Sequence, residues 1–443
     1  MFDLILSGGR VVGAGGVTAT DIAVSDGVIA ALLPSGAPAE AHRILDVTGT
    51  LVLPGLVDAH VHLREPGLTQ KEDFVSGTRA AAAGGVTTVL VMPTDDPWTS
   101  TSTQLAKKMA LATDRCCVDI GFQIAVSKAE VDLVALRHLG AISFEVFTAD
   151  VPKLFLHATL HELLCALQRI GPTGALACVS AGDQSILIAS DAAGGRDVSA
   201  FTSSRPPIAE ASGIARTVLA ASALGARVHL RQSNSALGIA TFGRLRSMAD
   251  VSIETTVQNL IFTDADYLRL GAGIKASPPF RRDSDVEALR AAVRDGTVDI
   301  VATDHAPHSR AEKSAPYDRF GDVPGGMAGL QTLLPMMLHL VDVGVLGLTD
   351  IARLCAANPA ERFGIGHRKG RIAVGLDADL VVVDPAKSMI IRSDEQYSKA
   401  GYTPFDGLSV PYHLALVFLR GQEIASNGQA LDIRIGRLMT HAT

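Results

Sequence analysis

An apolar run that suits a β-strand alternates eight times with a longer stretch that suits an α-helix. Such alternation over about 300 residues is typical of a (β/α)8 barrel, in which parallel strands are linked by outer helices. A doubly wound open sheet has the same periodicity, so the polar residues have to distinguish the two. The eight runs begin at Leu56, Thr87, Cys116, Ala141, Ala175, Ala226, Val251 and Val298.

The two ends of the chain have a different texture. Residues 1–54 and the stretches 369–385 and 412–425 consist of short apolar runs separated by glycine-rich turns, a pattern that favours short antiparallel strands. Each end alone has too few strands to bury a face. We therefore predict an α/β protein with two domains: a (β/α)8 barrel over 55–365 and a small β-sandwich built from 1–54 plus 366–443.

Composition excludes several classes of function. The chain has 443 residues, 47% of them hydrophobic and 19% charged, which is the balance of a folded protein rather than a disordered one. A formal net charge of −7 leaves no basic surface for nucleic acid or anionic lipid. No run approaches the roughly 20 apolar residues of a membrane helix. Five scattered cysteines without a CxxC pair, and no secretory signal, predict reduced thiols and a cytoplasmic location.

Histidines and carboxylates gather at the predicted strand ends. In the first run Asp58, His60 and His62 alternate with apolar residues, so they share one face of a strand and both histidines can reach one ion. Asp304 follows the last run, where a barrel carries its reactive groups. An acid there can ligate a metal and accept a proton from an activated water. Capping of the following loop is the ordinary alternative for this residue.

Two further groups occupy corresponding positions on other strands. Glu145 lies on the fourth run and His229 on the sixth, and each alone is more often a structural residue. Five metal-competent groups at the ends of four strands are harder to explain in that way, and their distribution favours the barrel over the open sheet. A mixture of imidazoles and carboxylates suits zinc. The predicted metal ligands are His60, His62, Glu145, His229 and Asp304.

At this point the chain resembles the cyclic amidohydrolases, which include dihydroorotase, hydantoinase or dihydropyrimidinase, and allantoinase. The resemblance covers nearly the whole chain. The matching segments are PGLVDAHVHLREPGLTQKEDF, AAAGGVTTVLVMP, IETTVQNL, KASPPFR, DIVATDHAPH and ANPAERFGIGHRKGRIAVGLDADLVVVDP. HVHLREPG followed by KED is most similar to dihydroorotase.

The resemblance implies roles for individual residues. Arg64 would grip a substrate carboxylate, Asp304 would be the catalytic base, and His308 would contact the substrate ring or carboxylate. Thr94 stands where dihydroorotases typically carry Asn, which leaves the carboxylate pocket altered and the substrate open. The family also implies a homodimer or tetramer and the β-sandwich beside the barrel.

Two positions depart from the family's two-metal centre. A carboxylated lysine usually bridges the metals from the fourth strand, and this chain has Glu145 there. Glutamate keeps the negative charge but reaches about 4 Å less far. A histidine usual on the fifth strand is replaced by Ser180, whose hydroxyl is a poor zinc ligand. We therefore expect one zinc ion per chain, with Glu145 and His229 near it.

The leading hypothesis is metal-dependent hydrolysis of a cyclic amide, namely the reversible conversion of dihydroorotate to N-carbamoyl-L-aspartate in pyrimidine biosynthesis. One alternative keeps the chemistry and changes the ring to a hydantoin, dihydropyrimidine or allantoin. Another is a weakly active subunit that supports aspartate transcarbamoylase. The expected partner is thus a small cyclic amide, with neither nucleic acid nor membrane involved.

Overall fold

The eight predicted runs form one parallel sheet that closes into a barrel. The computed structural model describes residues 1–192 and 194–440. Neighbouring strands pair in chain order, and the last returns to the first: Val61 bridges His305, and the His62 amide donates to the His305 carbonyl over 2.7 Å. The strands are β7 (Leu56–Val61), β8 (Val86–Val91), β9 (Asp119–Ala125), β10 (Ala141–Phe147), β11 (Leu176–Ser180), β12 (Val228–Leu230), β13 (Val251–Thr256) and β14 (Ile300–Ala302).

Burial and one carboxylate hold the barrel closed. Its strands are buried along nearly their whole length, as expected for a parallel sheet covered by helices on its outside. Asp58 on β7 accepts hydrogen bonds from the backbone and the hydroxyl of Thr303, directly after β14. Burial raises the pKa of this carboxyl to about 6. The closed barrel, rather than an open sheet, is therefore confirmed.

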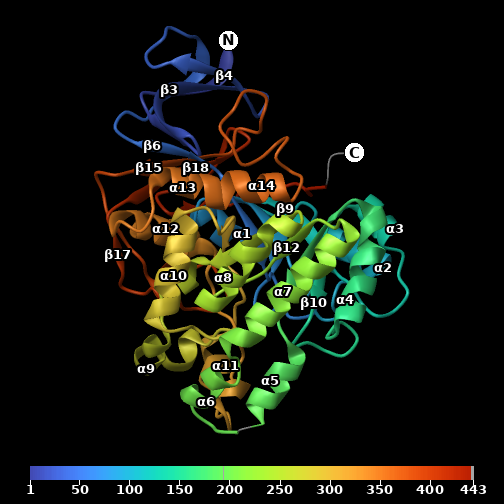
Figure 1. The fold of residues 1–443 in the computed structure, drawn as a ribbon. Coiled ribbons are helices and arrows are strands. Elements are labelled where there is room, and N and C mark those ends of the chain that lie inside the picture. Colours follow the sequence, from blue (N-terminus) through green and yellow to red (C-terminus); the bar gives the residue numbers. More distant parts are fainter. Residues whose placement is uncertain (193, 441–443) are drawn as a thin grey trace.

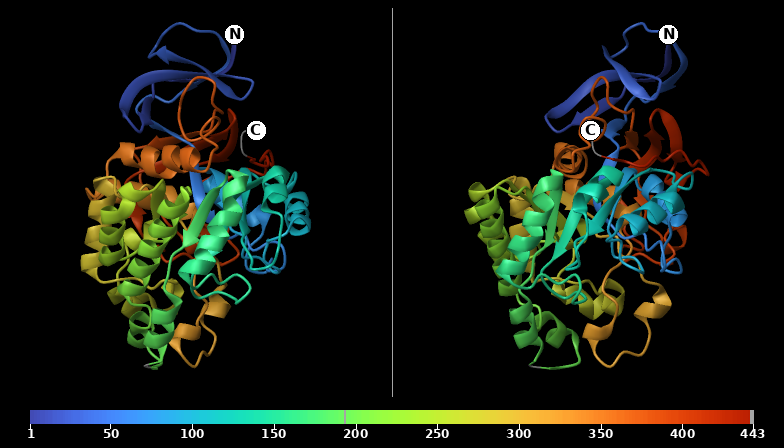
Figure 2. Two further views of the ribbon diagram at one scale, coloured as in Figure 1. Left: turned by 45° about the vertical axis from the view of Figure 1, so that its right-hand side comes forward. Right: turned by 90° about the vertical axis from the view of Figure 1, so that its right-hand side faces the viewer.

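Helices surround the barrel (Figures 1 and 2). α1 and α4 begin with capping boxes at Asp73 and Thr159, and α7 begins with Pro207 as its first residue, which suits a helix start. Figure 1 shows α5, α6, α9 and α11 at the end opposite the additional sheet. The helices are α1 (Phe74–Ala83), α2 (Ser102–Ala112), α3 (Leu133–Leu139), α4 (Leu160–Ile170), α5 (Gln184–Asp191), α6 (Val198–Ser203), α7 (Pro207–Leu224), α8 (Ala236–Leu245), α9 (Tyr267–Leu270), α10 (Asp283–Arg294), α11 (Arg310–Lys313), α12 (Leu333–Asp342), α13 (Leu348–Ala352) and α14 (Asn358–Arg362).

Both ends of the chain build the additional sheet. Its order is β20-β19-β18-β15-β6-β2-β3-β1-β5, with β4 attached to β3. β6 and β15 pair antiparallel, so the two ends meet inside one hydrogen-bonded sheet. Its strands are β1 (Phe2–Ser7), β2 (Arg10–Gly13), β3 (Gly16–Ser25), β4 (Val28–Pro34), β5 (Ala41–Asp46), β6 (Leu51–Pro54), β15 (Leu380–Asp384), β18 (His413–Leu419), β19 (Gln422–Ser426) and β20 (Gln429–Ala430); β16 (Met389–Ile390) and β17 (Ser409–Val410) form a separate pair.

The two chain ends also share one apolar core on this sheet. Ile22 and Val52 from the first part pack with Val382 and Phe418 from the second, and all four are at most 1% exposed. This packing explains why neither end could bury a face alone. The domain boundaries at 54/55 and 365/366 stay predictions.

A buried ion network joins the sheet to the barrel. Lys369 Nζ lies 2.6 Å from Asp119 Oδ2 at the start of β9, and 2.7 Å from Asp379 Oδ2 just before β15. Arg420 reaches the same Asp119 carboxylate over 2.6 Å. In the part of the chain that the structure describes, no helix is both long and apolar enough to cross a membrane.

Candidate metal centre and pocket

Three of the predicted ligands converge at the carboxyl ends of the barrel strands. The Nε2 atoms of His60 and His62 lie 3.3 Å and 3.1 Å from Asp304 Oδ1. One ligand atom from each of the three residues lies within 4.8 Å of the others. His60 points inward from β7, and Asp304 follows β14 with φ of 45°, a conformation that residues other than glycine rarely adopt. Tertiary closure of the barrel thus brings together residues more than two hundred positions apart.

The outer nitrogens of both histidines are held by other groups. His60 Nδ1 lies 2.5 Å from Glu254 Oε1 on β13, and His62 Nδ1 lies 2.7 Å from Thr94 Oγ1 after β8. When each Nδ1 carries the proton and donates it outward, each Nε2 presents a lone pair to the centre. The donor set of two imidazoles and one carboxylate therefore fits a single divalent ion, with coordination positions left open.

The charges at the centre match this assignment. Burial lowers the pKa of His62 to about 3, so this ring is neutral at physiological pH. Burial alone would raise the pKa of Asp304, but the two histidines lower it below its ordinary value, so the carboxylate is ionised. Burial alone would lower the pKa of His60, but Asp304 and Glu254 raise it. The carboxylates on both sides of His60 thus favour a cation at this point.

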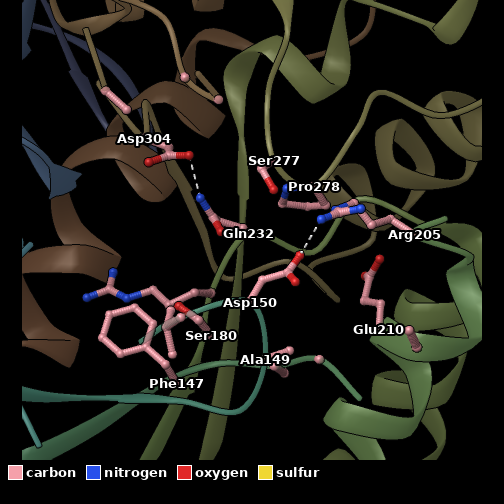
Figure 3. Close-up of a pocket in the computed structure, with 18 of the residues that line it drawn as sticks. Phe147, Ala149, Asp150, Ser180, Arg205, Glu210, Gln232, Ser277, Pro278 and Asp304 are labelled. Atoms are coloured by element: carbon pink, nitrogen blue, oxygen red, sulfur yellow. Dashed lines mark hydrogen bonds and ion pairs between the residues drawn. The ribbon is translucent and has the colours of Figure 1, made fainter. Parts of the chain in front are cut away.

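A cavity of about 310 Å³ opens next to the three ligands, large enough for a small ring (Figure 3). Polar groups include Gln232 and Glu210, and apolar side chains such as Phe147 and Ile214 form part of the wall. Four arginines line it. Three have acceptors within the protein: Arg205 pairs with Asp150 at 2.9 Å, Arg281 donates to Asn234, and Arg231 binds buried carboxylates.

Arg64 differs from the other three arginines. It is only 9% exposed, lines the cavity and has φ of 59°. Within the described residues its guanidinium makes no hydrogen bond or ion pair, and its Nε is both buried and unpartnered. Burial lowers its pKa from the ordinary value. A buried guanidinium without a directly bonded anion is costly, and nearby carboxylates, that of Asp304 foremost, offset part of the effect of burial on its pKa.

The structure does not bring the two remaining predicted ligands into the group of three. Glu145 is fully buried and paired with Arg231 at 2.7 Å. His229 is also fully buried, with Nδ1 2.8 Å from Ser252 Oγ and Nε2 2.9 Å from Glu254 Oε2. Both ring nitrogens are therefore engaged. Ser180 lines the cavity at the end of β11.

The predicted substrate residues have different surroundings. Thr94 Oγ1 contacts Nδ1 of His62, one of the predicted ligands. His308 Nδ1 lies 3.2 Å from Lys71 Nζ, and its Nε2 lies 3.1 Å from the Gly325 carbonyl, so the protein already engages both nitrogens. Burial lowers the pKa of His308 to about 3, and the charge of Arg64 adds to the effect.

Sequence reasoning missed three residues of the site. Gln232 follows β12, has φ of 54° and donates through Nε2 to Asp304 Oδ2. Glu254 orients His60, and Arg231 binds Glu254 and Glu145. Two polar residues after the end of a barrel strand, Arg231 and Gln232 after β12, are a signal for Gln232. Arg231 and Glu254 lie on or beside apolar strands, where ionic residues are rare unless paired.

Comparisons with known proteins agree with this geometry. The Amidohydrolase family model matches residues 51–424. A dihydroorotase of Halobacterium salinarum is 38% identical over 84% of this chain and 86% of its own length. An allantoinase of Rubrobacter xylanophilus is 35% identical over 99% and 97%. The solved L-hydantoinase (dihydropyrimidinase) from Arthrobacter aurescens superposes with a TM-score of 0.95 at 31% identity, covering 100% of both chains. The family model covers most of the chain, and we conclude that this protein belongs to the amidohydrolase family of metal-dependent hydrolases.

Proposed function

We propose that this hydrolase opens a cyclic amide that carries a carboxylate, and that the substrate is dihydroorotate, which it converts reversibly to N-carbamoyl-L-aspartate. The observation that carries the proposal is the buried, unpaired guanidinium of Arg64 beside the three-residue metal centre. A planar guanidinium binds a carboxylate through two parallel hydrogen bonds. Pairing with the substrate would give the buried guanidinium the directly bonded anion that it lacks, so binding energy is directed toward an anionic ring.

The chain's own residues supply the remaining chemistry. His60, His62 and Asp304 would hold one divalent ion, and we propose zinc. Such an ion acidifies water and polarises a carbonyl as a Lewis acid. The ionised Asp304 accepts the proton of the attacking water as the oxygen adds to the ring carbonyl carbon. When the carbon–nitrogen bond breaks, Asp304 returns that proton to the leaving nitrogen. The Gln232 amide holds the second oxygen of Asp304 in place.

A hydantoin-type ring is the second candidate. Apolar side chains in the cavity wall, Phe147, Leu187 and Ile214 among them, suit a ring with an apolar substituent, and the fold superposes on an L-hydantoinase. Such rings lack the carboxylate that would pair with Arg64. The cytoplasmic location, the homodimer or tetramer and the aspartate transcarbamoylase partner stay predictions.

The test compares two arginines of the same cavity. Arg64→Met should raise KM for dihydroorotate by about 100-fold, because charge-assisted hydrogen bonds contribute about 1.5–3 kcal/mol each and 1.4 kcal/mol corresponds to a factor of ten. It should change the hydrolysis of hydantoin and allantoin by less than about threefold. Arg205→Met is the matched control, since Arg205 already has Asp150 as its partner.

Initial rates on the panel of rings should be measured with zinc content on the same samples. Equal losses on dihydroorotate and on the carboxylate-free rings would contradict the role of Arg64. Turnover of hydantoins alone would transfer the assignment to the second candidate. Bound zinc without turnover on any ring would favour a subunit that supports another enzyme.

A further inference from the structure

A single buried guanidinium lies at the centre of an ion network beneath the metal centre. Arg231 is 3% exposed, and its Nε and Nη2 both bind Glu145, at 3.3 Å and 2.7 Å. Nη1 donates to Glu254 over 2.9 Å and to the Ala59 carbonyl over 3.0 Å, and Nη2 also donates to Gln123. All five N–H donors of the guanidinium therefore have acceptors. The acceptors come from β7, β9, β10 and β13, so the network spans the barrel interior.

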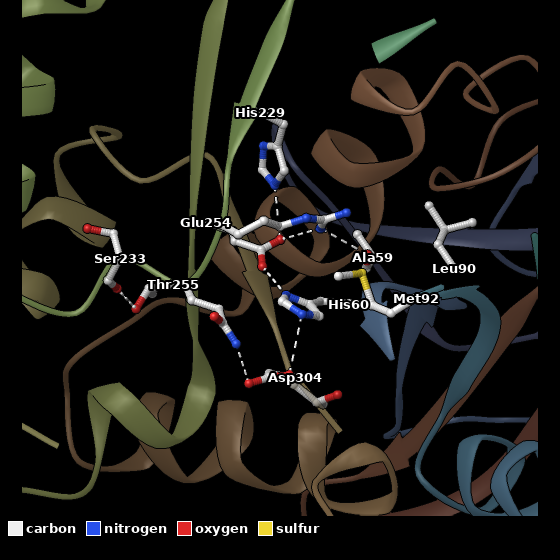
Figure 4. A network of polar contacts seen from close by, with 12 residues as sticks. Ala59, His60, Leu90, Met92, His229, Ser233, Glu254, Thr255 and Asp304 are labelled. Atoms are coloured by element: carbon white, nitrogen blue, oxygen red, sulfur yellow. Dashed lines mark hydrogen bonds and ion pairs between the residues drawn. The ribbon is translucent and has the colours of Figure 1, made fainter. Parts of the chain in front are cut away.

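The network reaches the metal centre through one carboxylate. Glu254 Oε2 binds Arg231 and His229, and Glu254 Oε1 binds His60 Nδ1 at 2.5 Å (Figure 4). Because His60 presents its other nitrogen toward Asp304, the position of Glu254 sets both the tautomer and the orientation of a ligand. Arg231 holds Glu254 from the side opposite His60.

We propose that Arg231 is a cation built into the protein where other members of the family place a second metal ion, and that it makes this centre a single-ion centre. Glu145 is held in an ion pair with Arg231 and does not ligate metal. Through Glu254, Arg231 is also a positioning residue for His60. This proposal deepens the proposed function. It rests on that function for the identity of the reaction, but not for the number of metal ions.

Charge supports the assignment. The carboxylates of Glu145 and Glu254, both fully buried, and of Asp304 carry three negative charges, and Arg231 carries one positive charge. One divalent ion beside Asp304 makes this set neutral, whereas a second would leave two uncompensated positive charges in the barrel interior, at a high desolvation cost. Burial alone would lower the pKa of Arg231, but the neighbouring anionic groups raise it well above its ordinary value, so the guanidinium stays charged.

Ligand supply supports it as well. The two acidic and imidazole donors that the sequence offers for a second ion are already engaged: Glu145 binds Arg231, and both nitrogens of His229 have partners. Ser180 and Gln232 offer only a neutral hydroxyl and an amide, and the Gln232 amide nitrogen already donates to Asp304. Neutral oxygen donors of this kind are weak ligands for zinc.

The first measurement is zinc stoichiometry without substrate. The purified chain is stripped with a chelator, titrated with zinc chloride in bicarbonate-containing buffer, and analysed by inductively coupled plasma mass spectrometry. We expect one zinc ion per chain. Saturation at two ions, or folded protein that binds none, would overturn the single-ion centre. Since no substrate is present, a chain that binds one zinc but fails to hydrolyse dihydroorotate removes the proposed function and leaves this inference standing.

The second measurement tests the positioning role. The double variant Arg231→Gln, Glu145→Gln removes the Arg231–Glu145 ion pair and leaves Glu254 bonded only to His60 and His229. It should weaken zinc binding by about 10- to 100-fold, the usual effect of losing a group that orients a ligand. Lys369→Met is the matched control. Lys369 is another buried cation paired with carboxylates, and it contacts β9 at the start of that strand rather than the metal centre. The control variant should leave zinc affinity unchanged.

Circular dichroism verifies that each variant is folded. If the double variant fails to fold, Arg231→Lys retains the charge, loses the forked geometry, and should weaken zinc binding by about tenfold. An affinity equal to that of the wild type in a folded Arg231 variant would refute the positioning role. An equal loss in Lys369→Met would show that general destabilisation, not the orientation of His60, controls the affinity.

Discussion

Lys369→Met should lower the free energy of unfolding by several kilocalories per mole while leaving the surface of the protein unchanged. Lys369 Nζ lies 2.6 Å, 2.8 Å and 2.7 Å from carboxylate oxygens of Asp119, Asp377 and Asp379. The lysine side chain is 1% exposed, and those of its three partners are at most 8% exposed. Arg420 remains on Asp119, but Asp379 keeps only the Arg420 amide as a nearby donor.

The expected loss of unfolding free energy is about 3–5 kcal/mol, because removal of one partner leaves a buried charge uncompensated. Lys387→Met is the control: Lys387 pairs with Asp384 at 3.0 Å but is 69% exposed, so its removal should cost less than about 1 kcal/mol. Guanidinium chloride unfolding, followed by circular dichroism and by the fluorescence of Trp98, measures both changes.

A second check is how the loss of unfolding free energy in Lys369→Met depends on pH. Burial already raises the pKa of Asp379 in the folded protein, and loss of the lysine raises it further. The folded variant therefore binds more protons than the unfolded chain, and its stability relative to the wild type should improve as the pH falls from 8 toward 5. A deficit no larger than that of Lys387→Met, or one that grows on acidification, would refute the reasoning.

Three further outcomes are expected at the site and near it. Asp304→Asn should lower kcat by about 10²- to 10⁴-fold with the fold intact, since the proton acceptor is lost; steady-state rates with circular dichroism measure this, and near wild-type turnover would remove Asp304 as the base. Thr94→Val should weaken zinc binding by about 10- to 100-fold by releasing His62 Nδ1, as seen in zinc titration, and an unchanged affinity would show that Thr94 does not orient the ring. Burial, and next the charge of Lys275, lower the pKa of Lys313 to about 7, so above that pH the unfolded chain binds more protons and Lys313 should contribute a rise in stability of at most about 2.7 kcal/mol from pH 7 to 9. Lys313→Met should reduce the rise seen in denaturant titrations to the part that Lys275, with its pKa lowered to about 8, supplies, and an identical pH profile in the variant would contradict this.

The sequence alone determined the architecture and the first part of the metal centre. Strand and helix periods, together with weak strands at both chain ends, are local properties, so the barrel and the shared sheet could be predicted from spacing. His60 and His62 share a face because strand side chains alternate, and Asp304 follows a strand end. Their meeting point follows from barrel closure, since the carboxyl ends of all eight strands lie together.

Only the tertiary structure decided which side chains are bound to one another inside the barrel. The sequence placed Glu145 and His229 on strands beside the predicted centre, but it could not show that Arg231 is bonded to Glu145 across 86 residues, or that Glu254 lies between His60 and His229. Those contacts depend on the relative height of strands around the barrel, which sequence spacing does not encode. A carboxylate at the right position is therefore not yet a ligand: the nearest cation in three dimensions determines whether it binds metal or protein.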